Sequence, residues 1–121
     1  SSRLMDALPA VPPTIVHAAA AESQKSPVGA YSLAILDVVP GNMQAFNDGL
    51  AAGAKNLPII ASWRTIVGKH NQVTDVWKGA LRTDGYQRAD ERTKQFFRGI
   101  RALAPRERLV IAHPLPYSPL Q

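Results

Sequence analysis

The stretch IIASWRTIVGKHNQVTDVWK, residues 59–78, decides the fold of this 121-residue chain. Residues 59–67 and 72–78 are rich in β-branched and aromatic side chains, which favour strands. Residues 68–71 lie between them and contain Gly and Asn, which tolerate the backbone conformations of a tight turn. The stretch therefore predicts an antiparallel β-hairpin.

Side chains of the second strand in this hairpin point to opposite faces of the sheet in turn. This places Val73, Asp75 and Trp77 on one face, and Thr74 and Val76 on the other. Both faces are largely apolar, which fits a sheet that is covered on both sides. A second copy of the chain would cover one face, so the pattern is the first indication of a dimer.

The segments around the hairpin complete an α+β domain. Residues 30–38 predict a strand, and Asn42 is placed to cap a helix over residues 43–57. A second helix is expected at about residues 86–103, and a last strand at 108–113. The order β-α-β-β-α-β is the ferredoxin-like plan, which predicts four antiparallel strands with two helices on one face.

Three details of these helices bear on packing. Gly49 and Gly53 each weaken the first helix by up to roughly 1 kcal/mol, or else let it pack closely on the sheet. In the second helix, Asp90 precedes Lys94 by four residues, which is a favourable pairing. The expected buried stripe of that helix comprises Ala89, Phe96, Phe97, Ile100 and Leu103.

The composition excludes several kinds of site. The chain has no cysteine, which rules out disulfides, thiolate nucleophiles and Cys-ligated metals. No apolar run approaches the ~18–20 residues needed to cross a bilayer, so no membrane span is expected. His17, His70 and His113 lack a second His or carboxylate at ligand spacing, so neither a metal site nor a cofactor is expected.

The formal charge of +5 is concentrated in one region of the chain. Residues 82–108 contain eight of the fourteen Lys and Arg residues, against four Asp and Glu residues. A solvated outer helix face explains this distribution, and a surface for an anion or RNA is the alternative. The sequence has neither an aromatic-rich RNA-binding signature nor a Gly-rich phosphate loop, so nucleic-acid binding is not expected.

Three stretches carry a family resemblance: GAYSL at 29–33 with VPG at 39–41, the hairpin segment 63–77, and PLPYSPL at 114–120. Together they resemble the NIPSNAP family. The likeness covers roughly residues 29–120, so the domain is placed at residues 29–121. It implies a dimeric α+β barrel, in which two four-stranded sheets meet face to face. It also implies a role in protein association. The expected location is the cytoplasm if the source is bacterial and the mitochondrion if it is eukaryotic.

Two positions depart from the family's pattern. Ile66 stands where an acidic residue usually follows Thr65, and Asp75 stands where a His commonly precedes Trp77 by two residues. An acidic residue and a His together could serve proton transfer, so their absence favours a domain without catalysis. No catalytic residue is therefore assigned.

Residues 1–28 lie outside the likeness and admit two interpretations. A short pattern at residues 7–16 echoes residues 102–111 at an offset of 95 residues. Because members of the family often carry two domains in tandem, the segment is either the tail of a preceding copy or an unattached Pro- and Ala-rich leader. The first interpretation predicts a helix at Leu4–Leu8 and a strand at Thr14–Ala18.

Five residues are candidates for the lining of a ligand pocket, namely Tyr31, Trp63, Arg64, Asp75 and Trp77. Trp at a sheet centre is more typical of a core or an interface, and its indole N–H needs one partner. Arg64 directly follows Trp63 and so points to the opposite face of the sheet. It is expected to form an ion pair with Asp75 or Asp37, or else to clamp an anion.

These observations favour a non-catalytic association domain that acts as a dimer or larger assembly and presents a surface or binds an apolar small molecule. The first alternative is a cofactor-independent enzyme of the dimeric barrel type, such as an oxygenase or isomerase. The second alternative is a surface for anions or nucleic acid on the Arg-rich second helix. A polar-lined cavity with two or more convergent titratable groups would distinguish the enzyme.

Overall fold

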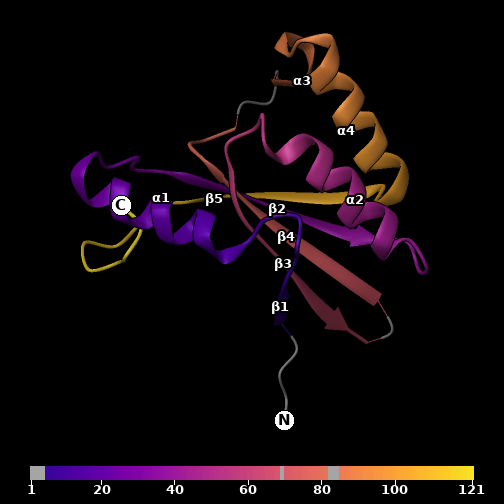
Figure 1. Cartoon of the computed structure of the whole chain (residues 1–121), viewed down its shortest axis with the longest axis horizontal. Coiled ribbons are helices and arrows are strands. Elements are labelled where there is room, and N and C mark those ends of the chain that lie inside the picture. The colour runs from indigo at the N-terminus through magenta and orange to yellow at the C-terminus, as the bar shows by residue number, and fades with distance from the viewer. Residues whose placement is uncertain (1–4, 69, 82–84) are drawn as a thin grey trace.

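The computed structural model describes residues 5–68, 70–81 and 85–121 of the chain. Along the chain, the elements are β1 (Met5–Ala7), α1 (Pro13–Lys25), β2 (Tyr31–Val38), α2 (Met43–Ala54), β3 (Ile59–Val67), β4 (His70–Lys78), α3 (Gly85–Arg88), α4 (Glu91–Leu103) and β5 (Arg106–Ala112). The strands form one antiparallel sheet, with α2 and α4 on one side of it and α1 on the other (Figure 1).

The order of strands in the sheet is β1-β3-β4-β2-β5. Strands β2, β3, β4 and β5 with helices α2 and α4 follow the expected β-α-β-β-α-β order, and every pair of neighbouring strands is antiparallel. This arrangement confirms the α+β class and is compatible with the ferredoxin-like plan. The fifth strand, β1, was not expected and lies on the outer side of β3.

The central hairpin is confirmed, but its turn is shorter than expected. Val67 pairs with His70, and Ile66 pairs with Asn71, so two of the expected turn residues belong to β4. Gly68 has a φ of 63°, a left-handed conformation that glycine adopts without a steric penalty. Lys69, the other residue of the turn, lies outside the described residues.

The main core lies between the sheet and the helices α2 and α4. Phe46 and Leu50 of α2 and Val73 of β4 are fully buried there, and Trp77 stacks on Phe97 with ring centroids 5.9 Å apart. The expected stripe is confirmed for Ile100, which is buried, and for Phe96, Phe97 and Leu103, which pack against the same core. Ala89, its fifth expected member, lies before α4 and is outside this core. Alternation therefore predicted the correct side for Val73 and Trp77.

Helix α2 is shorter than expected, and its Gly53 contacts helix α4 rather than the sheet. It begins after Asn42, whose backbone carbonyl accepts from the Phe46 N–H at 2.8 Å, although the Asn42 side chain caps no N–H of the described helix. A Cβ at Gly53 would overlap the ring of Phe96 on α4. Glycine at this position thus lets α4 approach α2 closely.

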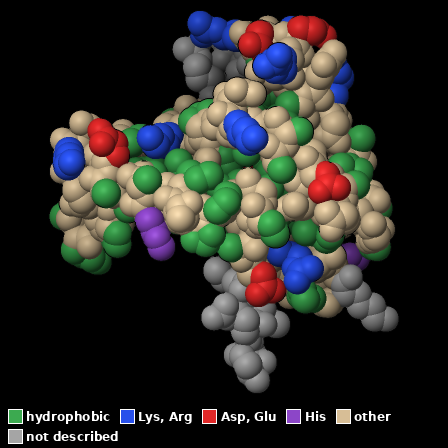
Figure 2. Space-filling model, in the orientation of Figure 1, with side chains coloured by type: hydrophobic (Ala, Val, Ile, Leu, Met, Phe, Trp, Pro, Cys, Tyr) green, Lys and Arg blue, Asp and Glu red, His purple; other side chains and the backbone are tan. Residues whose placement is uncertain are grey.

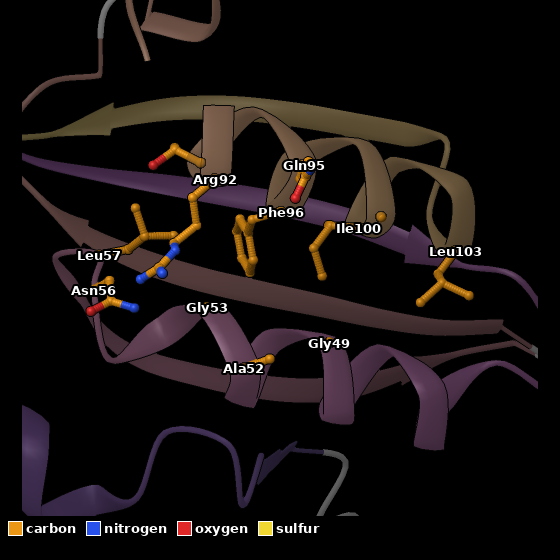
Figure 3. A pocket seen from close by; sticks show the side chains of 12 residues that line it. Gly49, Ala52, Gly53, Asn56, Leu57, Arg92, Gln95, Phe96, Ile100 and Leu103 are labelled. Atoms are coloured by element: carbon orange, nitrogen blue, oxygen red, sulfur yellow. The ribbon is translucent and has the colours of Figure 1, made fainter. Parts of the chain in front are cut away.

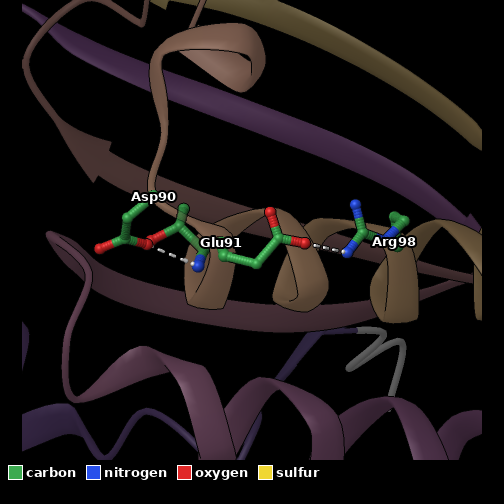
Figure 4. A network of polar contacts seen from close by, with 4 residues as sticks. Asp90, Glu91 and Arg98 are labelled. Carbon is green, nitrogen blue, oxygen red and sulfur yellow. Dashed lines mark hydrogen bonds and ion pairs between the residues drawn. The ribbon is translucent and has the colours of Figure 1, made fainter.

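The prediction of a single helix over residues 86–103 is wrong, because the helix is interrupted between α3 and α4. Asp90 is the N-cap of α4 and accepts a hydrogen bond from the Thr93 backbone N–H at 2.8 Å (Figure 4). That hydrogen bond holds the pKa of Asp90 below its usual value. Glu91 also pairs with Arg98 at 3.0 Å (Figure 4). A carboxylate that can cap a helix competes with the helical backbone, which explains the break.

Both interpretations of residues 1–28 are wrong in their structural detail. Met5–Ala7 is a strand rather than a helix, Pro13–Lys25 is a helix rather than a strand, and Leu4 lies outside the described residues. Proline suits the first helical positions and alanine is the best helix former, so PPTIVHAAAA begins a helix. Nor is the segment an unattached leader, since β1 pairs with β3 over Met5↔Thr65 to Ala7↔Trp63.

Helix α1 covers part of the second face of the sheet. Ala19 is buried there against Tyr31, Ile60 and Val76. The helix is also attached to the C-terminal tail, because the Ser23 hydroxyl accepts from the Gln121 backbone N–H at 3.0 Å. The face that the sequence assigned to a partner sheet is thus partly occupied by this chain's own N-terminal helix.

Candidate functional site

The five candidate pocket residues do not meet in one place. Tyr31 and Trp63 lie on the face covered by α1, whereas Asp75 and Trp77 lie on the face covered by α2 and α4. Arg64 lies opposite Val73 and therefore shares the second of these faces. The opposite orientation of Trp63 and Arg64 is confirmed, and the sheet itself separates the two groups.

Asp75 is the candidate whose carboxyl group is buried and has a raised pKa. Its side chain is 4% exposed and lies opposite Ser62, whose hydroxyl donates to the carboxyl oxygen Oδ1 at 2.6 Å. Burial raises the pKa of Asp75 from 3.8 to about 7, because desolvation disfavours the charged carboxylate. The Ser62 hydrogen bond opposes this rise, and the negative charge of Glu107 adds to it.

Tyr31 and Trp77 are core residues rather than lining residues. Within the described part of the chain, the Tyr31 hydroxyl and the Trp77 indole nitrogen are buried without a hydrogen-bond partner. An unpaired buried donor costs roughly 1–3 kcal/mol, which the large apolar surface of each ring offsets. The partner expected for the Trp77 N–H is thus not found among the described residues.

Arg64 forms its ion pair with neither of the expected partners. Its guanidinium lies 3.3 Å from the carboxylate of Asp6 in β1. Asp75 is engaged with Ser62, and the Asp37 carboxylate accepts from Gln72 at 3.3 Å. The sequence could not indicate Asp6 as the partner, because the pairing of β1 with β3 joins residues 58 positions apart.

Strand β5 forms the free edge of the sheet. In the described residues it pairs with β2 and has no strand on its other side. Leu109, Val110 and Ile111 are 43%, 41% and 40% exposed, and alternation places Val110 on one face and its neighbours on the other. The sequence predicted a strand here but held no sign that it would lie at an edge.

A cleft of about 350 Å³ lies between α2 and α4 (Figure 3). Phe96, Ile100 and Leu103 of α4 and Leu57 after α2 supply its apolar walls, and Arg92 and Asn56 lie at one end. Sequence reasoning missed this cleft as a site. Its one local signal was the pair Gly49 and Gly53, which removes side chains from the α2 wall.

Over residues 5–68, 70–81 and 85–121, no group of three or more His, Asp or Glu side chains could hold a metal ion. No helix in the same residues has the length and apolar character needed to cross a bilayer. Basic and acidic side chains are interspersed over α3 and α4 (Figure 2), as on a solvated helix face.

Comparison of the chain with protein-family models, with curated proteins and with solved structures gave no match.

Proposed function

We propose that this chain is a non-catalytic association domain of the NIPSNAP kind, which joins two copies of itself through the free edge of β5. One observation carries the proposal. Three consecutive aliphatic side chains, at residues 109–111, are each at least 40% exposed on a seven-residue edge strand. Charged side chains occupy only the first three positions of that strand, Arg106 to Arg108.

An edge strand exposes a row of unpaired N–H and C=O groups, which a further strand can satisfy. Antiparallel pairing of β5 with its own copy is self-complementary about a two-fold axis, as a symmetric dimer requires. The pairing would extend the sheet across both copies and bring the aliphatic side chains of the two strands together. At the opposite edge, the three-residue β1 already covers part of β3.

The edge is a better surface for association than the face expected from the family resemblance. Helix α1 packs over Tyr31, Ile60 and Val76, so a second sheet could lie against that face only beyond α1 or after α1 moves. Attachment of α1 to the C-terminal tail through Ser23 opposes such a movement. Pairing through β5 requires no rearrangement of α1.

The two alternative functions have less support. An enzyme would need a second group that acts with Asp75, but the neighbour of that buried carboxyl is the Ser62 hydroxyl, which donates to it. A nucleic-acid surface on α4 would need a field of one sign, whereas Glu91 and Asp90 accompany the basic residues there (Figure 4).

Light scattering coupled to gel filtration tests the proposal at micromolar protein concentration. We expect the wild-type mass to be twice 13.1 kDa. Val110→Lys places a charge on the edge and should shift the mass to that of one chain. Val39→Lys is the matched control, because Val39 is 39% exposed but lies outside the strands. A wild-type protein with the mass of a single chain would overturn the proposal.

A further inference from the structure

We propose that the cleft between α2 and α4 binds a small amphipathic carboxylate, with the carboxylate on Arg92 and the apolar body along Phe96 and Ile100. This site is separate from the β5 edge, and the proposal holds whether or not the chain forms a dimer.

The shape of the cleft favours a small molecule. Its volume of about 350 Å³ lies near the lower end of the roughly 300–1,000 Å³ typical of small-molecule sites. Figure 3 shows the side chains of Phe96 and Ile100 extending from α4 into the space between the helices. The α2 wall opposite them consists of Gly49, Ala52 and Gly53, which have little or no side chain.

The position of the glycines shows why the space is not closed by packing. At Gly53 the ring of Phe96 already fills the position of a Cβ, so the two helices touch at that level. At Gly99 a Cβ would meet no atom within 4 Å, so the α4 side of the cleft is open there. A ligand that fills this part would cover apolar surface on Ile100 and Leu103, which both line the cleft.

The charge at the end of the cleft selects an anion. Arg92 is exposed, and its guanidinium extends toward the Asn56–Leu57 turn at the end of the cleft (Figure 3). Among the described residues, Arg92 forms neither a hydrogen bond nor an ion pair; the nearby Asp90 carboxylate attracts it electrostatically but accepts its hydrogen bond from the Thr93 N–H. A guanidinium presents a planar fork that matches a carboxylate. Asn56 supplies an amide at the same end.

An apolar wall with one guanidinium at its end favours a ligand with an apolar chain or ring and a single carboxylate. A neutral apolar molecule would make no use of the Arg92 charge, and a highly charged phosphate compound would place its charges against Phe96 and Ile100. Octanoate has the required chemistry and serves as the probe. Octanol is the neutral analogue of equal length, and octylammonium is its cationic counterpart.

Titration calorimetry and amide chemical shifts of the full chain test the site. We expect octanoate to bind and to shift the amide signals of Gly53 and Gly99. Arg92→Gln should weaken octanoate binding by about tenfold and leave octanol binding unchanged, since the charged pair contributes only for the acid. Arg101→Gln, on the same helix but outside the cleft, is the matched control and should bind octanoate as the wild type does.

A second variant tests the position by filling the space. Ala52→Phe adds a ring at an exposed position of the α2 wall and should abolish octanoate binding, whereas Ala45→Phe, exposed on α2 outside the cleft, should not.

The proposal is overturned if octanoate does not bind or if octanol and octylammonium bind as well as octanoate does. It is equally overturned if Ala52→Phe binds normally. Binding to anionic phospholipid vesicles without binding to octanoate would assign the cleft to a membrane surface instead. A change of mass in Ala52→Phe without an effect on octanoate would assign it to a second copy.

Discussion

The hydroxyl of Ser62 donates a 2.6 Å hydrogen bond to the carboxyl of Asp75. Both side chains are buried, and the two residues lie opposite each other on neighbouring strands. The pair joins β3 to β4 on the face that α2 and α4 cover. Because this carboxyl is isolated from water, its protonation state is coupled to the stability of the fold.

Deprotonation of the buried Asp75 carboxyl should make the protein less stable as the pH rises. The folded carboxyl has a pKa of about 7, whereas the unfolded one ionises near 3.8, so the folded state binds more protons between these values. The free energy of unfolding should therefore fall from about pH 4 to pH 7, by at most about 4 kcal/mol for this group. Urea unfolding across that range measures the slope.

Asp75→Asn should remove this slope while keeping the acceptor for Ser62, because the amide oxygen replaces the carboxyl oxygen. Above pH 7 the variant should be more stable than the wild type. Asp37→Asn changes an exposed carboxylate on β2 and should retain the wild-type slope. Equal slopes for wild type and Asp75→Asn would show that Asp75 does not titrate in this way.

Gly53→Ala should destabilise the contact between α2 and α4. The new Cβ would overlap the ring of Phe96, and overpacking of this kind costs roughly 1–3 kcal/mol. The higher helix propensity of alanine offsets at most about 1 kcal/mol of that cost. Chemical denaturation measures the difference.

Gly99→Ala is the matched control for this change, since it adds the same methyl group to a helix where nothing lies within 4 Å. It should stabilise the protein by up to about 1 kcal/mol. If both alanine variants were equally stable, the close approach of Phe96 to Gly53 would not exist in solution.

Ala19→Lys should detach α1 from the sheet. Ala19 is buried against Tyr31 and Ile60, so a lysine there must displace the helix or bury its charge. We expect a loss of at least about 1 kcal/mol, or a few degrees in the melting temperature. Ala18→Lys changes the neighbouring exposed residue and should leave the melting curve unchanged.

Fluorescence separates detachment of α1 from general unfolding. Trp63 packs against the same cluster as Ala19, whereas Trp77 lies in the other core. In a Trp77→Phe background, Ala19→Lys should shift Trp63 emission to longer wavelength under native conditions. An unshifted spectrum together with an unchanged melting curve would contradict the docking of α1.

Asp6→Asn should change the free energy of unfolding only slightly, in contrast to Asp75→Asn. The Asp6 and Arg64 side chains are 57% and 36% exposed, and exposed ion pairs contribute about 0–1 kcal/mol. A double-mutant cycle of Asp6→Asn with Arg64→Gln should give a coupling energy below about 1 kcal/mol, decreasing as salt is added. A coupling of several kcal/mol would mean that the pair is more buried than the structure shows.

Asp75 could be selected as a candidate from the sequence, whereas the cleft at Arg92 could not. Asp75 was selected as a candidate residue, but its low exposure follows from the packing of α2 and α4 over β4. Arg92 was noted only as one of many basic residues. Its position at a cleft depends on where α2 ends, at Ala54, and on the Asn56–Leu57 turn that follows.

The sequence by itself determined the central hairpin, the α+β class, the order of β2, α2, β3, β4, α4 and β5, and the side of the sheet on which Val73 and Trp77 lie. These features depend on side-chain period and turn chemistry, which act over a few neighbouring residues. Only the tertiary structure decided the pairing of Met5 with Thr65, the packing of α1 on the second face and the position of β5 at the edge. Each of these depends on contacts between segments far apart in the chain, for which local periodicity holds no information about the partner.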